Sequence, residues 1–221
     1  DFFGGSVDIS PNGNALVIGS PGYYNNDQPG YVRVFSLESG NDLDTGSWKQ
    51  IGEDIVEEAI GDEFGNSVSL SKDGKTIAIG AKSNNGNGDN SGHVRVYRLD
   101  DSRSSWLQLG DDIDGEAGYD SSGYSVSLSA DGKTVAIGAP YAVNDGINVD
   151  WTGQVRVFVM ESSTAIGLAM YLSPTVSPTT PVSKRIRLHA SFYSTTRISR
   201  CHHLGCTRSP ISPSLKSCHR F

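Results

Sequence analysis

Oxygen-bearing side chains alternate in one short loop of this chain, and they are the first candidates for chemistry. The loop "NNGNGDNSG" at 84–92 places Asn85, Asn87 and Asp89 at alternate positions. Amide and carboxylate oxygens so spaced could bind a hard cation such as Ca²⁺, which takes six or more oxygen ligands. The counterpart loops at 23–30 and 142–153 do not keep this spacing. Clusters of Gly, Asn and Asp between strands are ordinary loop material, so we predict a solvated loop and no bound cofactor.

Two pairs of adjacent carboxylates, Asp100-Asp101 and Asp111-Asp112, are the candidates for glycosidase-like acid–base chemistry. That chemistry requires two carboxyl groups at a controlled separation. Adjacent residues of a strand point to opposite faces, so neither doublet forms such a pair by itself. Residues 1–160 contain one histidine, His93, and no cysteine. We therefore predict that the chain is not an enzyme.

The last forty residues or so contain all three cysteines of the chain. The candidate zinc ligands there are Cys201, His202, His203, Cys206, Cys218 and His219. They do not form the two spaced ligand pairs of a zinc finger, and a Ser/Thr/Pro stretch at 173–183 separates them from the rest of the chain. We predict no metal site and assign residues 161–221 to a linker and a disordered basic tail.

A repeat organises the remainder of the sequence. "SVDISPNGNALVIGSP" at 6–21, "SVSLSKDGKTIAIGAK" at 67–82 and "SVSLSADGKTVAIGAP" at 125–140 are copies of one phrase. A second phrase, G-x-V-R-V followed by an aromatic residue, follows each copy. Repeats at a fixed period indicate stacked structural units. The spacing divides residues 1–160 into units of about 1–61, 62–119 and 120–160.

Within each unit the apolar residues alternate with small polar ones, which predicts β-strands. In the second unit this alternation covers 67–71 and 76–80, and Asp73-Gly74 lies between these two strands. The third unit has Asp131-Gly132 at the same place, and such pairs favour the positive φ angles of a two-residue hairpin turn. Further strands are expected at 93–99 and 106–113.

Four antiparallel strands per unit of about 60 residues are typical of one blade of a β-propeller. The sequence therefore predicts an all-β fold, a partial β-propeller of about 2.5–3 four-stranded blades that forms an open arc. We expect further blades of a longer chain to complete it.

Charged and aromatic residues that recur in the units favour structural roles. Arg33, Arg95 and Arg156 occupy the same strand position in each unit, and we expect structural pairing, most simply with Asp54 and Asp112 or with a neighbouring blade. Trp48 and Trp106 begin the repeated phrase W-x-Q-x-G-x-D-I, and we expect both to pack on the outer strands.

The opening Phe64-Gly65 of the second unit, with Phe3-Gly4 in the first, and the closing Gly138-Ala139-Pro140 of the third hairpin resemble FG-GAP repeats of the integrin α-subunit β-propeller. The W-x-Q-x-G-x-D-I phrase also resembles secreted propeller arrays of algae and other protists. The third unit departs from the pattern with Ser122-Gly123 in place of Phe-Gly. The resemblance implies an extracellular or cell-surface propeller that binds ligands through its loops. The family's calcium loop is not carried over, because each turn here has one Asp or Asn before its glycine.

Charge is distributed unevenly along the chain. Residues 1–160 contain 10 Lys and Arg against 24 Asp and Glu, a net charge of −14, whereas residues 161–221 contain 8 against 1. An acidic body argues against a nucleic-acid partner, since binding phosphates requires clustered basic residues. The longest apolar candidate, "AIGLAMYL" at 165–172, is too short to span a bilayer.

Together these observations predict a non-catalytic binding or adhesion module for a protein or glycan. The candidate binding residues lie in the loops between strands: Asn85, Asn87, Asp89, Asn144, Asp145, Asp150 and Trp151. Two alternatives stay open. One is a secreted glycan-acting hydrolase whose catalytic residues lie in further blades, and the other is a purely structural repeat protein.

Overall fold

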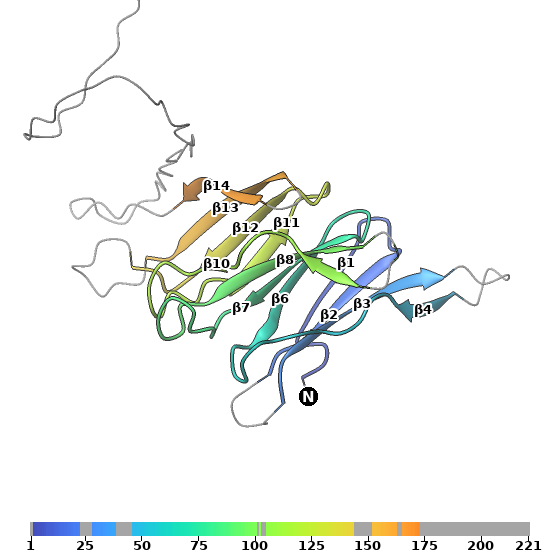
Figure 1. Cartoon of the computed structure of the whole chain (residues 1–221), viewed down its shortest axis with the longest axis horizontal. Coiled ribbons are helices and arrows are strands. Elements are labelled where there is room, and N and C mark those ends of the chain that lie inside the picture. The colour runs from blue at the N-terminus through green and yellow to red at the C-terminus, as the bar shows by residue number, and fades with distance from the viewer. Residues whose placement is uncertain are drawn as a thin grey trace, which may run out of the picture.

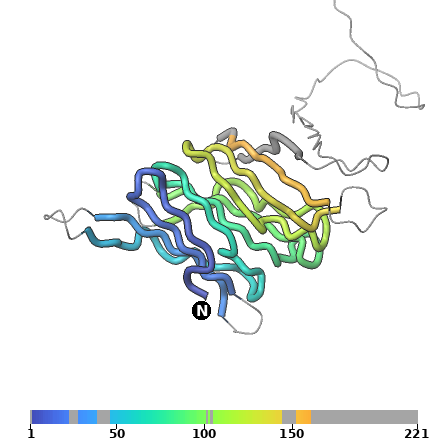
Figure 2. Tube along the Cα trace, turned by 180° about the vertical axis from the view of Figure 1, so that it is seen from behind, coloured from blue at the N-terminus to red at the C-terminus, as the bar shows by residue number. Residues whose placement is uncertain are grey.

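The computed structural model describes residues 2–22, 28–38, 46–100, 102, 105–143, 152–162 and 165–172. All regular structure in these ranges is β-strand, in three antiparallel sheets that lie one against the next (Figures 1 and 2). Each sheet corresponds to one sequence repeat. Within the same ranges, the chain has no helix of the length and apolar character needed to cross a membrane.

The first and second sheets share one design, with three long strands and a short broken outer strand. The first sheet contains β1 (Ser6–Ile9), β2 (Ala15–Ser20), β3 (Tyr31–Glu38), β4 (Ser47–Gln50) and β5 (Ile55–Val56). The second contains β6 (Phe64–Leu70), β7 (Thr76–Ala81), β8 (His93–Leu99), β9 (Trp106–Gln108) and β10 (Ile113–Asp114). Both β9 and β10 pair with β8, as β4 and β5 pair with β3.

The single fourth strand expected at 106–113 is wrong, because the structure divides it into β9 and β10. Gly110 lies between the two pieces with a φ of +68°, and Gly52 has +72° at the same place in the first sheet. A left-handed residue interrupts the extended backbone there. The break turns the chain so that Asp54 and Asp112 face the arginines of the neighbouring strand.

The third sheet contains β11 (Ser125–Leu128), β12 (Thr134–Ala139), β13 (Gln154–Ser162) and β14 (Ala165–Leu172). The strand β14 pairs with β13 along its length, with two register shifts. The sequence boundary at 160 is therefore too early for this sheet. The linker and tail beyond β14 lie outside the described residues.

The Asp-Gly pairs lie in hairpin turns, but the two-residue turn expected from the sequence is wrong. In the second sheet Ser71 Oγ donates to Asp73 Oδ1 at 2.6 Å and accepts from the Thr76 amide at 3.0 Å. The backbone pairs Ser71 with Thr76, and only Gly74 in the turn has a positive φ, +68°. Ser10-Asn12 and Ser129-Asp131 form the same contacts in the other sheets. The side chains of Asn12, Asp73 and Asp131 therefore stabilise the three hairpin turns.

The hydrophobic core lies between the sheets. The cluster between the first and second sheets contains Ala15, Val17, Val32, Val34, Ile55, Phe64, Val68, Leu70, Ile77, Ile79, Ala81 and Tyr97. The cluster between the second and third contains Ala78, Val94, Val96, Leu109, Ile113, Leu128, Val135, Ile137 and Phe158. Neighbouring residues of one strand, such as Ile77 and Ala78, thus enter different clusters, as strand geometry requires. Burial of each large side chain contributes roughly 1.5–3 kcal/mol.

A repeated serine–glycine contact, which we call the latch, joins each sheet to the next. Ser6 Oγ donates to the Gly65 carbonyl at 2.7 Å, and Ser67 Oγ donates to the Gly123 carbonyl at 2.8 Å. Gly80 stands beside the second latch, where a Cβ atom would overlap the Gly123 oxygen. Glycine is therefore required by the close approach of two backbones. Gly19 has the same relation to Gly65 in the first latch.

Candidate functional site

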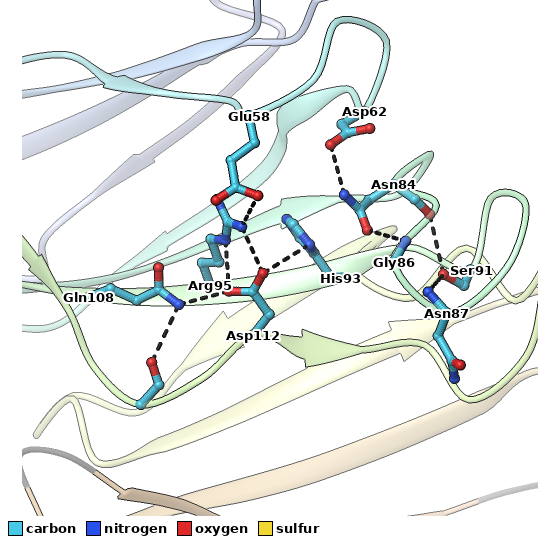
Figure 3. Close-up of polar contacts among 11 residues, drawn as sticks. Glu58, Asp62, Asn84, Gly86, Asn87, Ser91, His93, Arg95, Gln108 and Asp112 are labelled. Atoms are coloured by element: carbon cyan, nitrogen blue, oxygen red, sulfur yellow. Dashed lines mark hydrogen bonds and ion pairs between the residues drawn. The ribbon is translucent and has the colours of Figure 1, made fainter.

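Charged side chains of the second sheet form a network around Arg95 (Figure 3). Arg95 Nε and Nη2 donate to the two oxygens of Asp112 at 2.8 and 2.7 Å, and Nη2 also pairs with Glu58 Oε2 at 2.7 Å. Gln108 Nε2 donates to the same aspartate at 2.7 Å. The Arg95 side chain is only 5% exposed. The repeat thus places a buried guanidinium between carboxylates of two adjoining segments.

Burial and hydrogen bonding have opposite effects on the pKa values of Arg95 and Asp112. Burial by itself would raise the pKa of Asp112, but hydrogen bonds from Arg95 and Gln108 outweigh it and lower that pKa. Burial likewise opposes the charge of Arg95, and the hydrogen bonds to Asp112 and Glu58 raise the pKa of its guanidinium. Asp112 is therefore an ionised partner of Arg95 and is unsuited to donate a proton as a general acid.

The other two arginines of the series have different surroundings. Arg33 binds Asp54 at 2.8 Å, the pairing expected from the sequence, and its guanidinium lies 4.7 Å from the centre of the Tyr31 ring. Arg156 has no aspartate of the repeated phrase in its own unit, and it donates instead to the Asp114 carbonyl and, at 2.9 Å, to Ser122 Oγ. All three therefore connect segments within the fold.

His93 lies beside this network at the start of β8 and is 2% exposed. Its Nδ1 is 3.7 Å from Asp112 Oδ2, and β10 places Asp114 opposite it. Ligand atoms of His93, Asp112 and Asp114 lie within 4.8 Å of one another, the one such group among the described residues. Arg95 hydrogen-bonds to both Asp112 oxygens, so a cation bound there would lie next to a guanidinium charge. The arrangement favours an ion-pair network over a metal centre.

Stability should fall as the pH is lowered below about 6.5, because His93 is buried in its neutral form. Burial, and then the charge of Arg95, lower the pKa of His93. Its unfolded state therefore binds a proton first, and the stability it contributes is present above the ordinary histidine pKa and is lost below it. Chemical denaturation across this pH range measures the effect. His93→Gln should flatten this part of the profile, and an unchanged slope in that variant would contradict the assignment.

The side chains of the loop 84–92 form hydrogen bonds within the fold. Asn87 Nδ2 donates to the carbonyls of Gly115 and Glu116 at 2.8 and 3.0 Å. Asn85 Oδ1 accepts from the Asn90 amide at 2.8 Å. Asn87 therefore braces the loop against the segment 115–119, and the Asn85 bond is within the loop itself. The remaining candidates in the loops, Asn144, Asp145, Asp150 and Trp151, lie outside the described residues.

Tyr119 is a surface residue that the sequence did not single out. Its side chain is 63% exposed, and its φ is +68°. Tyr119 forms two hydrogen bonds with Asp89. Its amide donates to the Asp89 carbonyl at 2.7 Å, and its hydroxyl donates to Asp89 Oδ2 at 3.3 Å. Tyr119 ends the second unit, and the equivalent residue at the end of the first unit is Gly61, with a φ of +94°. The sequence signal that could have identified Tyr119 is a tyrosine at a position where the other copy of the repeat has glycine.

The two repeated tryptophans differ in their environment. Trp106 Nε1 donates to the Ile51 carbonyl at 3.1 Å, and its indole covers Gly52 of the first sheet. Trp48 is 42% exposed. The packing role expected of both is thus seen for Trp106, which connects two sheets.

The fold and these contacts describe a repeat protein made of stacked antiparallel sheets. Residues 57–97 match the family model described as FG-GAP repeat. This match confirms the FG-GAP resemblance for the second unit. No curated protein matches the chain.

Among solved structures, the chain is similar in shape to one described as "a putative 6-phosphogluconolactonase from Bacteroides uniformis". The two share 9% sequence identity with a TM-score of 0.39, over 78% of this chain and 57% of that one. The chain therefore spans little more than half of that protein, and a likeness at this level carries no statement about activity.

Proposed function

We propose that this chain is part of an FG-GAP β-propeller, in which each four-stranded unit is a blade, and that it acts as a non-catalytic binding module outside the cell or on its surface. The stacking of like units through one repeated latch supports the propeller arrangement. FG-GAP repeats are commonly extracellular, which supports the location. The ligand that we propose is a protein.

The observation that carries this proposal is the conformation of Tyr119. A non-glycine residue with a left-handed backbone costs of order 1–3 kcal/mol, and such strain is found preferentially at binding and active sites. Here the strain displays a large aromatic side chain to solvent at the edge of a braced loop pair. Tyrosine is enriched at protein interfaces because its ring offers contact area and its hydroxyl a hydrogen bond.

The surroundings of Tyr119 indicate the kind of surface that it would meet. Asp89 and Glu116 are exposed beside it, and Asn85 is exposed on the adjoining loop. We call Asn85, Asp89, Glu116 and Tyr119 the Tyr119 surface. Its net charge is negative, so it suits a partner with basic residues around an apolar contact.

An array of secreted proteins, printed beside a glycan array, tests the proposal. The chain should bind protein spots, and Tyr119→Gly should reduce that binding about tenfold or more, as loss of an interface aromatic does. Glycine suits the backbone conformation, so the variant should fold at least as stably as the native chain. Leu107→Ala, at an exposed position on β9, is the matched control and should bind normally.

Two results would contradict this proposal. One is protein binding that Tyr119→Gly leaves unchanged. The other is binding to glycans alone, which would assign the module to the other ligand class.

A further inference from the structure

Asparagine is followed directly by glycine at three places in the sequence, at Asn12, Asn85 and Asn87. The three asparagines are exposed, so water can reach each of them. In such a pair the backbone nitrogen of the glycine can attack the side-chain carbonyl carbon of the asparagine, because no Cβ atom shields that nitrogen. The three pairs are therefore candidate sites of deamidation, the reaction that converts asparagine to an acid.

The attacking nitrogen is held differently in the three pairs. Gly13 N donates to a backbone carbonyl at 2.7 Å, and Gly86 N donates to a side-chain oxygen at 2.8 Å. Gly88 N donates to a backbone carbonyl at 3.3 Å, which is longer than an ordinary hydrogen bond of this kind. A nitrogen in a short hydrogen bond must break that bond before it can react. The nucleophile is therefore least restrained in the pair that contains Asn87.

The leaving nitrogen also has different partners at Asn87. Its Nδ2 donates to the carbonyl oxygens of Gly115 and Glu116 at 2.8 and 3.0 Å. As Nδ2 gains a proton in the reaction, these hydrogen bonds become charge-assisted and therefore stronger. At Asn12 and Asn85 it is Oδ1 that forms hydrogen bonds within the fold. The surroundings of Asn87 thus stabilise the departing ammonia.

We propose that Asn87 is a site of spontaneous deamidation, and that the reaction releases the loop 84–92 from the segment 115–119. Gly88 N gives its proton to water and bonds to Asn87 Cγ, while the bond from Cγ to Nδ2 breaks and Nδ2 takes a proton from water and leaves as ammonia. Water then opens the cyclic imide that has formed. The net reaction converts an amide and water into a carboxylic acid and ammonia, and the product is aspartate or isoaspartate.

The product cannot form the contacts that Asn87 forms. A carboxylate has no N–H group to donate, so both hydrogen bonds to the segment 115–119 are lost. Its charge would face the two carbonyl oxygens instead, next to the negative side chains of Asp89 and Glu116. Because Tyr119 is bonded to Asp89 across this contact, the reaction would alter the Tyr119 surface. Only this last consequence rests on the binding function proposed above.

Peptide mapping of the full chain by mass spectrometry, after storage at neutral and at mildly alkaline pH, tests the reaction. Fragmentation of the peptides separates Asn85 from Asn87. Asn87 should deamidate at least about fivefold faster than Asn12 or Asn85, the factor to which one hydrogen bond of ordinary strength corresponds. The rate should rise with pH, because the attacking nitrogen must lose its proton. Conversion at Asn12 or Asn85 as fast as at Asn87, or no conversion at Asn87, would overturn the proposal.

Two variants test the release of the loop. Asn87→Asp reproduces the aspartate product and should speed hydrogen–deuterium exchange in the segments 84–92 and 115–119. Asn85→Asp adds the same charge to the same loop but keeps an oxygen that can accept from the Asn90 amide, so its exchange should match that of the native chain. Native exchange in Asn87→Asp, or equal increases in both variants, would show that the amide of Asn87 does not hold the loop. Neither experiment uses a ligand, so both can succeed where the proposed binding function fails.

Discussion

Gly80→Ala will lower the free energy of unfolding by about 3 kcal/mol, the upper end of the usual cost of overpacking. The added methyl would enter the space of the Gly123 carbonyl oxygen, and Ser67 Oγ closes the other side. Backbone lies on both sides of this contact, so the two sheets must separate to admit the methyl. Urea denaturation followed by circular dichroism measures the change.

Gly138→Ala is the matched control for this prediction. It stands at the same place in the third unit, where the three atoms nearest the new methyl all belong to Ser125, an exposed residue whose hydroxyl can rotate away. Because alanine is favoured over glycine in a strand by about 0.5–1 kcal/mol, the control should change stability little. Equal losses in both variants would show that the approach of the sheets is not what requires glycine at position 80.

Arg95→Met will destabilise the chain by about 3 kcal/mol, the lower part of the range for breaking a buried ion pair. The substitution removes the charge that neutralises Asp112 and leaves that carboxylate partly buried, with Gln108 as a remaining donor. Arg33→Met is the control. Arg33 is 36% exposed, and exposed pairs contribute about 1 kcal/mol or less.

The pH dependence of the stability of Arg95→Met is a second test of the Arg95–Asp112 pair. The pKa of Asp112 is lowered in the folded chain, so the stability that it contributes is present above the ordinary Asp value of about 4 and is lost as the pH falls below it. The variant should lose less stability in acid than the native chain does. A stability deficit that stays the same from neutral to acidic pH would argue against a role for the Asp112 charge.

Much of the fold could be predicted because the sequence repeats and its alternation is strict. The strand expected at 93–99 is β8 with the same bounds, since Gly92 precedes its alternating valines and two aspartates follow Leu99. The sequence predicts the outer strand at 106–113 as one piece, because the positive φ of Gly110 cannot be inferred from an alternating pattern. The sequence does not predict β14 as part of the sheet, because it lacks the W-x-Q-x-G phrase that marks the other outer strands.

Part of the candidate site could likewise be predicted from the sequence, and part could not. The pairing of Arg33 and Arg95 with aspartates could be inferred, because the first two units each repeat the arginine in one phrase and an aspartate at the same place in the W-x-Q-x-G-x-D-I phrase that follows. The role of Asn87 could not, since its carbonyl partners lie 28 and 29 residues away in another loop. The left-handed backbone and the exposed ring of Tyr119 can be seen only in the tertiary structure.

Hydrogen–deuterium exchange on the native chain, with and without a protein identified on the array, tests the proposed binding surface most directly. The account predicts that the ligand slows exchange in the segments 84–92 and 115–121, and that Tyr119→Gly removes this protection while leaving exchange in β7 and β8 unchanged. Protection confined to other segments, or protection that survives in Tyr119→Gly, would contradict it.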